Sequence, residues 1–372
     1  MLDDEAGQTK SRKAEHVDIV LHGDVKARVN AWDDVALVHE ALPEVDWDRV
    51  DLRTEFLGTA LRAPLMIVGM TGGYPEAERL NGRLAAAAAA HGIAMGVGSQ
   101  RAALRDPSLR RTYTVVRDHD VPFVAANLGA PQLVPQGDRK PVTLHDAKEL
   151  VSMLEADALA VHLNFLQEVV QPEGDRAAAG VEAAVHDLAR DLGVPVIVKE
   201  TGAGIRRSTA QRLAAAGASA LDTGGLSGTT FAAVELARAR AEGAARHARL
   251  GETFRDWGIP TPVSIVECAP ALPTIATGGL RDGLDAARAI AFGATIAGFA
   301  GEAIRAATED RVHAFLDGVL DGVRTAAFLT GSRDMESLHG AQLVVTGRLA
   351  EWLEAMGHDP RRFGVLRAGR AL

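Results

Sequence analysis

Short apolar segments alternate with helical segments eight times along this chain, and this alternation limits the fold more than any other feature. Each apolar segment is brief and hydrophobic throughout, as a strand buried on both faces is. The expected strands cover residues 65–68, 93–97, 123–126, 158–161, 195–198, 220–221, 274–276 and 294–297. Strands separated by helices form parallel βαβ units, so the pattern predicts a (β/α)8 TIM barrel with an N-terminal extension and C-terminal helices.

The segments between the expected strands have the composition of helices. The expected helices cover residues 77–91, 107–117, 144–154, 178–192, 208–216, 234–250, 284–292, 311–329 and 343–356. The interval 231–273 is longer than a crossover needs, which predicts a lid or an extra helix there. We expect three parts: an N-terminal extension (1–60), the barrel (61–330) and a C-terminal helical segment packed on the barrel (331–372).

The net charge and the cysteine content indicate which classes of partner and which cellular compartment to expect. The net charge is −9 and lysine and arginine do not cluster, so we expect neither nucleic acid nor a membrane as a partner. A single cysteine, Cys268, cannot form an internal disulfide, which favours a reducing compartment. The first residues do not resemble a signal peptide, and no apolar run is long enough to span a bilayer. We therefore expect a cytoplasmic protein.

Polar side chains stand at the ends of six expected strands. They are Thr71, Ser99, Asn127, His162, Lys199 and Asp222. The carboxyl ends of barrel strands meet at one rim, where barrel enzymes have their active sites. The densest group is His162, Asn164, Gln167 and Glu168. A polar loop that only solvates the strand end is the alternative, and the other strand ends favour a site.

Two glycine-rich turns and a lysine predict a phosphorylated cofactor at this rim. Residues 277–283 follow the seventh strand, and residues 224–230 follow the sixth. Gly293 and Ala294 open the eighth strand. Glycines let backbone N–H groups approach a phosphate, although tight turns explain glycines as well. Lys199 is costly to bury without an anionic partner, and the electron-rich edge of a flavin ring would serve as one.

Several motifs together resemble the type 2 isopentenyl-diphosphate isomerases. They are residues 70–73, 97–101, 162–168, 171–175, 198–200, 257–261 and 277–281, with Arg12, Lys13 and His16 near the N-terminus. The resemblance runs from about residue 12 to Leu353. The Gln-Glu pair with Gln-Pro-Glu-Gly-Asp is specific to that family, whereas many FMN barrels share Gly-Gly-Leu-Arg.

The resemblance implies an enzyme that converts isopentenyl diphosphate to dimethylallyl diphosphate with FMN and Mg²⁺. The flavin works reduced, NAD(P)H reduces it, and the substrate undergoes no net redox change. The part at 61–330 would be an FMN-binding barrel, and the extension would carry a substrate-binding segment. The family assembles as homo-oligomers, so a homotetramer or homo-octamer is expected.

The resemblance also implies roles for individual residues. The implied FMN contacts are Thr71, Gly72, Gly73, Ser99, Asn127, Lys199 and Thr229, with Gly278, Gly279, Arg281, Gly293 and Ala294 at the phosphate. The implied substrate contacts are Arg12, Lys13, Arg101, His162, Asn164 and Gln167. Glu168 would bind Mg²⁺, and Gln167, His162 and Lys199 would be catalytic. A glutamine is a poor acid, so positioning or relay is the expected role of Gln167.

Three residues depart from the family pattern, and two other functions are compatible with an FMN barrel. Ser227, Phe231 and Glu302 stand where the family commonly has glycine, tryptophan and proline. An FMN-dependent 2-hydroxy-acid oxidoreductase would need a His-Arg pair beyond the sixth strand, where no histidine precedes His247. A diverged FMN barrel that binds or acts on another prenyl diphosphate would retain the flavin without isomerising isopentenyl diphosphate.

Overall fold

Eight parallel strands close into a barrel. The computed structural model describes the backbone of residues 2–365 and the side chains of residues 12–365. The strands follow one another around the barrel in chain order, and β11 pairs with β4 to close it. They are β4 (Leu65–Ile67), β5 (Ala94–Gly96), β6 (Val124–Gly129), β7 (Ala158–Leu163), β8 (Val196–Glu200), β9 (Ala220–Asp222), β10 (Thr274–Ala276) and β11 (Ile296–Phe299). The predicted (β/α)8 TIM barrel is confirmed.

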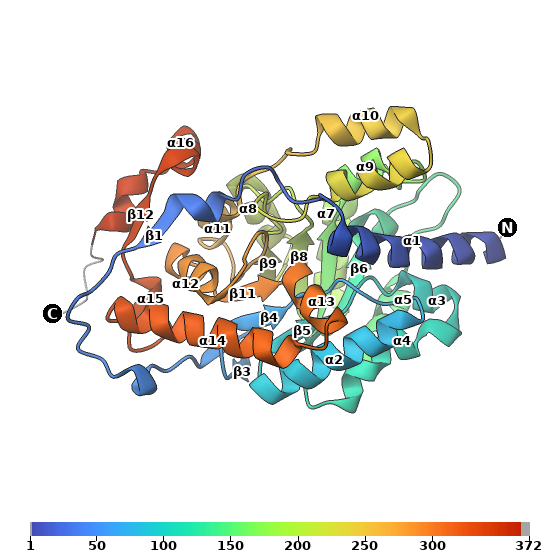
Figure 1. The fold of residues 1–372 in the computed structure, drawn as a ribbon. Coiled ribbons are helices and arrows are strands. Elements are labelled where there is room, and N and C mark those ends of the chain that lie inside the picture. The colour runs from blue at the N-terminus through green and yellow to red at the C-terminus, as the bar shows by residue number, and fades with distance from the viewer. Residues whose placement is uncertain (1, 366–372) are drawn as a thin grey trace.

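Helices surround the barrel, as Figure 1 shows. The main ones are α2 (Glu76–His91), α5 (Leu144–Leu154), α7 (Val181–Asp191), α8 (Arg207–Ala215), α11 (Thr261–Cys268), α12 (Gly283–Phe292) and α14 (Val312–Leu329). Their apolar faces pack on the outward side chains of the strands and form the larger core. Among residues 2–365, no helix combines the length and the apolar character that a membrane crossing requires.

A second core fills the barrel itself. It consists of inward side chains such as Met66, Ala125 and Ile197, with Phe56 and Leu61 from outside the barrel. The last two belong to a hairpin of β2 (Thr54–Phe56) and β3 (Thr59–Leu61). The rings of Phe56 and Phe123 meet edge to face at 5.3 Å. Because Phe123 precedes β6, the hairpin closes the amino-terminal end of the barrel and leaves the other end open.

Three expected helices differ from the structure. The helix expected over 234–250 is two helices, α9 (Phe231–Ala241) and α10 (Ala245–Thr253), because Gly243 between them takes φ +71°. The helix expected over 107–117 is broken into short turns around α4 (Arg111–Thr114). The helix expected over 343–356 begins as a strand, β12 (Leu343–Val345), which pairs with β1 (Val35–Leu37) before α16 (Gly347–Ala355).

The N-terminal segment covers the open end of the barrel. Helix α1 (Leu2–His22) packs against α9, against α3 (Arg101–Arg105) and against α13 (Gly301–Thr308), as its position in Figure 1 shows. Residues 24–32 then cross the turns after β9 and β10, and we call them the strap. Ala27 N donates to Gly228 O at 2.8 Å, and Trp32 Nε1 donates to Gly278 O at 3.0 Å. The part boundaries at residues 60 and 330 stay predictions.

Candidate active site

A cavity of about 740 Å³ opens at the carboxyl-terminal rim of the barrel. It brings together most of the residues that the sequence singled out. They are Arg12, Lys13, Gly72, Ser99, Arg101, Asn127, His162, Asn164, Gln167, Glu168, Lys199, Thr229, Gly278, Gly279 and Arg281. Its volume lies in the range of small-molecule and cofactor pockets. Segments as distant in the chain as α1 and α13 therefore share one chamber.

Two predicted cofactor residues lie just behind the cavity wall. Thr71 is buried and its hydroxyl donates to the Tyr74 hydroxyl at 2.9 Å. The backbone N–H of Gly73 donates to Thr112 Oγ1 at 2.9 Å. Both residues are absent from the cavity lining, although their neighbour Gly72 is part of it. Their polar groups hold the turn after β4 in shape.

The prediction that Gly293 and Ala294 hold the cofactor phosphate is wrong. Gly293 takes φ +116° and ends α12, and the backbone O of Ala294 accepts from His339 Nε2 at 2.8 Å. Both precede β11, so they lie at the amino-terminal end of the barrel, opposite the cavity. The expected eighth strand began two residues too early. The end of β11 and the residues after it line the cavity instead, among them Gly298, Ala300 and Gly301.

The strand register places the rim residues next to one another. His162 on β7 is level with Lys199 on β8, and Lys199 is level with Asp222 on β9. His162 Nδ1 lies 2.8 Å from Asn127 Oδ1. Burial, with the nearby charges of Lys199 and Lys13, lowers the pKa of His162 to about 3. The imidazole is therefore neutral and donates its Nδ1 proton to Asn127.

Lys199 lines the cavity at the rim, and its nearest carboxylate is beyond hydrogen-bonding distance. Its Nζ donates to the backbone O of Glu200 at 2.9 Å and lies 3.8 Å from Asp222 Oδ2. Burial raises the pKa of Asp222, while Lys199 and the Thr277 hydroxyl oppose the shift. The ammonium thus retains hydrogen-bonding capacity toward the cavity, where an electron-rich acceptor would complete its coordination.

Glu168 is a buried carboxylate that accepts hydrogen bonds from three neighbouring groups. Its Oε1 accepts from Asn164 Nδ2 at 2.9 Å, and its Oε2 accepts from Gln171 Nε2 at 2.5 Å and from Asp175 N at 2.7 Å. Burial raises the pKa of Glu168, and the Asp175 N–H and Asn164 limit the rise. Asn164 Oδ1 and Gln171 Oε1 are buried without a partner. Oxygen acceptors therefore outnumber donors at this place.

These oxygens suit a hard cation that brings further ligands with it. No group of three or more His, Cys, Asp or Glu side chains in the described part of the chain could hold a metal ion alone. The Glu168 carboxylate would contribute one ligand, and buried amide oxygens lie beside it. Mg²⁺ characteristically takes one or two carboxylates and completes its shell with phosphate oxygens and water.

Gln167 is held by a carboxylate from another helix. Its Nε2 donates to Glu235 Oε1 at 3.0 Å, and its Oε1 accepts from Asn164 Nδ2 at 3.2 Å. His16 Nε2 from α1 lies 2.8 Å from the same Glu235 oxygen. Burial favours the neutral acid, but His16 and Arg238 outweigh it and bring the pKa of Glu235 down to about 2. Glu235 is therefore a buried anion that fixes the Gln167 amide.

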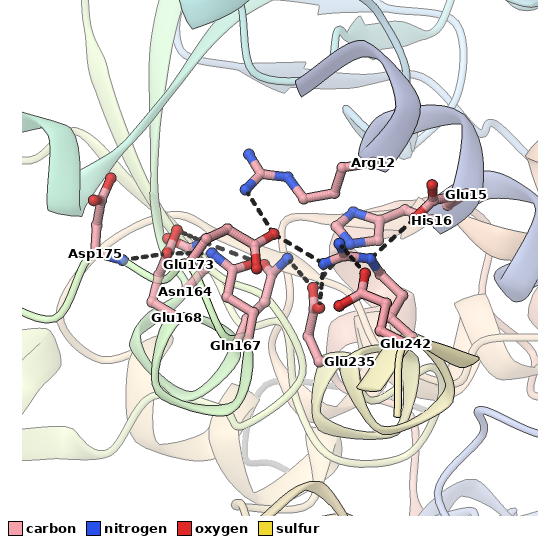
Figure 2. A network of polar contacts seen from close by, with 12 residues as sticks. Arg12, Glu15, His16, Asn164, Gln167, Glu168, Glu173, Asp175, Glu235 and Glu242 are labelled. Atoms are coloured by element: carbon pink, nitrogen blue, oxygen red, sulfur yellow. Dashed lines mark hydrogen bonds and ion pairs between the residues drawn. The ribbon is translucent and has the colours of Figure 1, made fainter. Parts of the chain in front are cut away.

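Arg238 anchors this group to the N-terminal helix, and Figure 2 labels the carboxylates that it contacts. Its guanidinium contacts four carboxylates, Glu15, Glu173, Glu235 and Glu242, at 2.8 to 3.2 Å. Glu15 belongs to α1 and Glu173 to the loop after α6 (Phe165–Val170). One buried cation therefore joins the covering helix, the loop beside Glu168 and helix α9.

Three cations face the cavity from the side of Glu168. Lys13 Nζ donates to Gly72 O, Ser99 O and the Tyr113 hydroxyl at 2.6 to 2.9 Å. Burial, with Arg12 and Arg101 nearby, lowers the pKa of Lys13 to about 7. Arg12 lies 3.4 Å from Glu173, and Arg101 lies 3.1 Å from Asp175. This concentration of positive charge is suited to a polyanion such as a diphosphate.

The opposite end of the cavity is built from glycines. A Cβ on Gly228 would lie 2.4 Å from Gly279 N, and a Cβ on Gly279 would lie 2.2 Å from Ser227 O. The turns after β9 and β10 therefore interlock backbone against backbone, which leaves N–H groups accessible to a phosphate. Arg281 lines this end, but its guanidinium pairs with Asp33 at 2.6 Å and with Asp285 at 2.7 Å.

Comparison with known proteins places the chain in a family. A search against protein-family models found no match. Isopentenyl-diphosphate delta-isomerases of Thermoplasma volcanium and Thermoplasma acidophilum are each 46% identical to this chain, covering 93% and 92% of it and 99% of each relative. That of Archaeoglobus fulgidus is 46% identical over 94% of this chain and 99% of the relative. The chain belongs to the isopentenyl-diphosphate delta-isomerase family.

A solved structure shares the architecture of this isopentenyl-diphosphate delta-isomerase family member. It is a mandelate oxidase mutant with the monooxide FMN adduct, at a TM-score of 0.60 and 16% identity, covering 86% of this chain and 91% of that chain. A likeness at this identity concerns the barrel fold. The sequence resemblance to the family and the predicted fold class are both confirmed.

Glu235 and Arg238 are site residues of this family member that were not predicted from its sequence. Both lie in a segment that was expected only as a charged helix, where Arg240 and Glu242 have the same residue types. Glu235 has no side-chain exposure, whereas Glu242 is 45% exposed. The available signal was the position of Glu235 on the α9 face that also carries Phe231. Without knowledge of what α9 packs against, that face cannot be identified.

Proposed function

We propose that this chain converts isopentenyl diphosphate to dimethylallyl diphosphate, with reduced FMN and Mg²⁺ bound in the cavity. The observation that carries the proposal is that Lys199, Gln167 and Glu168 line one chamber. The reaction needs a polarising cation, a positioned amide and a metal-binding carboxylate around one small molecule. The homologues' name gives the reaction, and this constellation supplies groups suited to it.

The chain's residues fit FMN at two places. The interlocked turns around Gly228 and Gly279 offer backbone to the phosphate, and Lys199 with the His162–Asn127 pair lies where the ring would rest. Reduced FMN would supply an electron-rich surface beside the alkene and a group able to exchange a proton. NAD(P)H is the proposed reductant. Lys199 would donate to the ring edge, and neutral His162 would contribute hydrogen bonds rather than charge.

The residues around Glu168 fit Mg²⁺. The Glu168 carboxylate and the unpartnered oxygens of Asn164 and Gln171 are acceptors without enough donors. A cation that coordinates Glu168 and bridges to the substrate diphosphate would correct this imbalance. Lys13, Arg12 and Arg101 would bind the remaining phosphate oxygens. The diphosphate would thereby be fixed at one end while the alkene extends toward Lys199 and Gln167.

The covering helix α1 would exclude water from the reaction. Moving a double bond passes through a state with positive charge on carbon, which water would capture. Helix α1 carries Arg12, Lys13 and His16 into the chamber and is tied down by Arg238. Gln167 cannot ionise, and its contacts with Glu235 and Asn164 fix the direction of its amide. We therefore assign it the positioning of the substrate's reacting carbons.

A direct assay tests the proposal. The purified protein is examined for flavin absorbance and then supplied with NADH or NADPH, Mg²⁺ and isopentenyl diphosphate. Dimethylallyl diphosphate formed only when all components are present supports the proposal. Flavin retained without this product would instead favour the diverged barrel. Oxidation of a 2-hydroxy acid with isomerisation absent would favour the oxidoreductase. Assembly as a homotetramer or homo-octamer and a cytoplasmic location stay predictions.

A further inference from the structure

An ion-pair bridge at the glycine-rich end of the cavity has no role in the proposed reaction. Lys26 Nζ lies 3.0 Å from Glu302 Oε1, and Arg305 Nη1 lies 2.8 Å from Glu302 Oε2. Lys26 belongs to the strap, whereas Glu302 and Arg305 belong to α13. All three residues line the cavity. The bridge therefore joins the N-terminal segment to the helix that follows the last barrel strand.

The bridge lies beside the turn that offers backbone to a phosphate. The backbone of Lys26 pairs with that of Thr229, and Ala27 N donates to Gly228 O. On the other side, a Cβ built on Gly301 would lie 3.7 Å from Thr229 Oγ1. Glu302 follows Gly301 directly. Both ends of the bridge therefore lie beside Thr229 in the turn after β9.

The cations at the glycine-rich end of the cavity pair with carboxylates that differ in burial. Arg281 is bound to Asp285, whose side chain has no exposure and also pairs with Arg288 at 2.7 Å. The Glu302 side chain is 27% exposed, so its carboxylate can turn to water at little cost. Lys26 and Arg305 can therefore exchange their carboxylate for another anion, whereas Arg281 could do so only by giving up its contacts with a carboxylate that has no solvent exposure, which would then keep Arg288 as its cation.

We propose that Lys26 and Arg305 are the counter-ions of the FMN phosphate, and that Glu302 occupies them until the phosphate arrives. This inference rests on the proposed binding of FMN. A phosphate monoester carries nearly two negative charges at neutral pH, so it replaces the carboxylate as the stronger partner of both cations. The displaced Glu302 carboxylate stays close enough to repel the phosphate. Glu302 therefore lowers the affinity for FMN, while Lys26 and Arg305 raise it.

Binding of FMN and of riboflavin, which lacks the phosphate, tests this assignment. Each flavin is titrated into the cofactor-free protein and the quenching of flavin fluorescence is followed. Glu302→Gln should tighten FMN binding roughly three- to tenfold, and Lys26→Met and Arg305→Met should each weaken it by a similar factor. All three variants should bind riboflavin with a Kd within about twofold of the wild type.

Arg28→Met is the matched control. Arg28 lies on the same strap and also pairs with two carboxylates, those of Asp256 and Glu252, at 2.8 and 2.9 Å. It is not part of the cavity lining. Its substitution should leave the Kd of both flavins unchanged. A loss of affinity that is specific to FMN in Lys26→Met and absent in Arg28→Met therefore points to the phosphate rather than to the fold of the strap.

The outcomes separate this inference from the proposed function. Misfolding cannot produce tighter binding, so Glu302→Gln is informative even where the other variants are unstable. FMN affinity that is unchanged or weaker in Glu302→Gln overturns the inference, as does an equal change for riboflavin. A wild-type protein that binds neither flavin overturns the proposed function itself. FMN binding that is normal in the wild type and indifferent to Glu302 overturns the inference alone.

Discussion

Gln167 Nε2 donates to Glu235 Oε1 at 3.0 Å and thereby joins α6, the short helix that follows barrel strand β7, to helix α9. The acceptor is a fully buried anion, with His16 and Arg238 as its other partners. A neutral amide that donates to a buried carboxylate makes a stronger, more directional hydrogen bond than it would to a neutral group. The orientation of Gln167 thus depends on a residue 68 positions later in the chain.

Glu235→Gln should destabilise the fold and impair turnover. The substitution leaves the buried Arg238 guanidinium without its closest carboxylate, and loss of one partner of a buried pair costs about 3 kcal/mol. We expect urea denaturation to show this loss and kcat to fall more than the affinity for substrate. Glu242→Gln is the control, because Glu242 contacts the same guanidinium from an exposed position and should change the unfolding free energy by less than about 1 kcal/mol. Equal effects of the two substitutions would contradict the role given to Glu235.

The charge of Lys13 should set the alkaline side of the pH profile. Its folded pKa is about 7, so the ammonium that binds a diphosphate is present below pH 7 and is lost above it. We expect kcat/KM to fall as the pH rises through about 7, and Lys13→Arg to move that decline to higher pH because arginine keeps its proton. A decline that is unchanged in Lys13→Arg would exclude Lys13 as its source.

The lowered pKa of Lys13 also makes the free energy of unfolding depend on pH. Unfolded Lys13 has a pKa near 10.5 and the folded residue has one near 7, so the unfolded chain binds more protons between these values. Stability of the cofactor-free protein should therefore receive a contribution from Lys13 that rises with pH across this window. Thermal unfolding of wild type and Lys13→Met at pH 7 and pH 9 measures it. The stability of the wild type relative to Lys13→Met should be greater at pH 9 than at pH 7.

Glu168→Gln should raise the Mg²⁺ requirement. The substitution retains the shape and removes the charge that would bind the cation, so the Mg²⁺ concentration for half-maximal activity should rise roughly tenfold or more. Glu173→Gln provides a comparison from the loop beside Glu168, since the Glu173 carboxylate pairs with Arg12 and Arg238. Its Mg²⁺ requirement should stay within about twofold of the wild type. An unchanged requirement in Glu168→Gln would remove the metal role.

Gly228→Ala should separate the interlocked turns. The added methyl would lie 2.4 Å from Gly279 N, so one backbone segment must move, at a cost of about 1–3 kcal/mol. FMN affinity should fall with it. Gly318→Ala is the control in helix α14, where nothing lies within 4 Å of the new Cβ, and it should stabilise the protein by about 0.5–1 kcal/mol. Chemical denaturation of the two variants and flavin titration check both expectations, and a neutral Gly228→Ala would show that the turns tolerate separation.

Local patterns in the sequence were sufficient for the barrel and for much of the rim. Alternating apolar and helical segments determine the parallel strands, and a residue directly after such a strand must lie at the carboxyl rim. This reasoning held for Ser99, Asn127, His162 and Lys199, which all line the cavity. It did not cover Gly293, whose phosphate role was implied by the family resemblance: this glycine ends α12 and precedes β11, so it lies at the opposite rim.

Contacts between distant segments were decided only by the tertiary structure. Arg281 was expected at a phosphate, yet its guanidinium is held by Asp33 and Asp285, and Glu235 became a site residue only because α9 lies against Gln167. Short-range patterning fixes which face of an element is apolar and where it ends, since those depend on neighbours in the chain. It does not specify which charged side chain meets which partner, because that depends on how whole elements pack and on which charges become buried together.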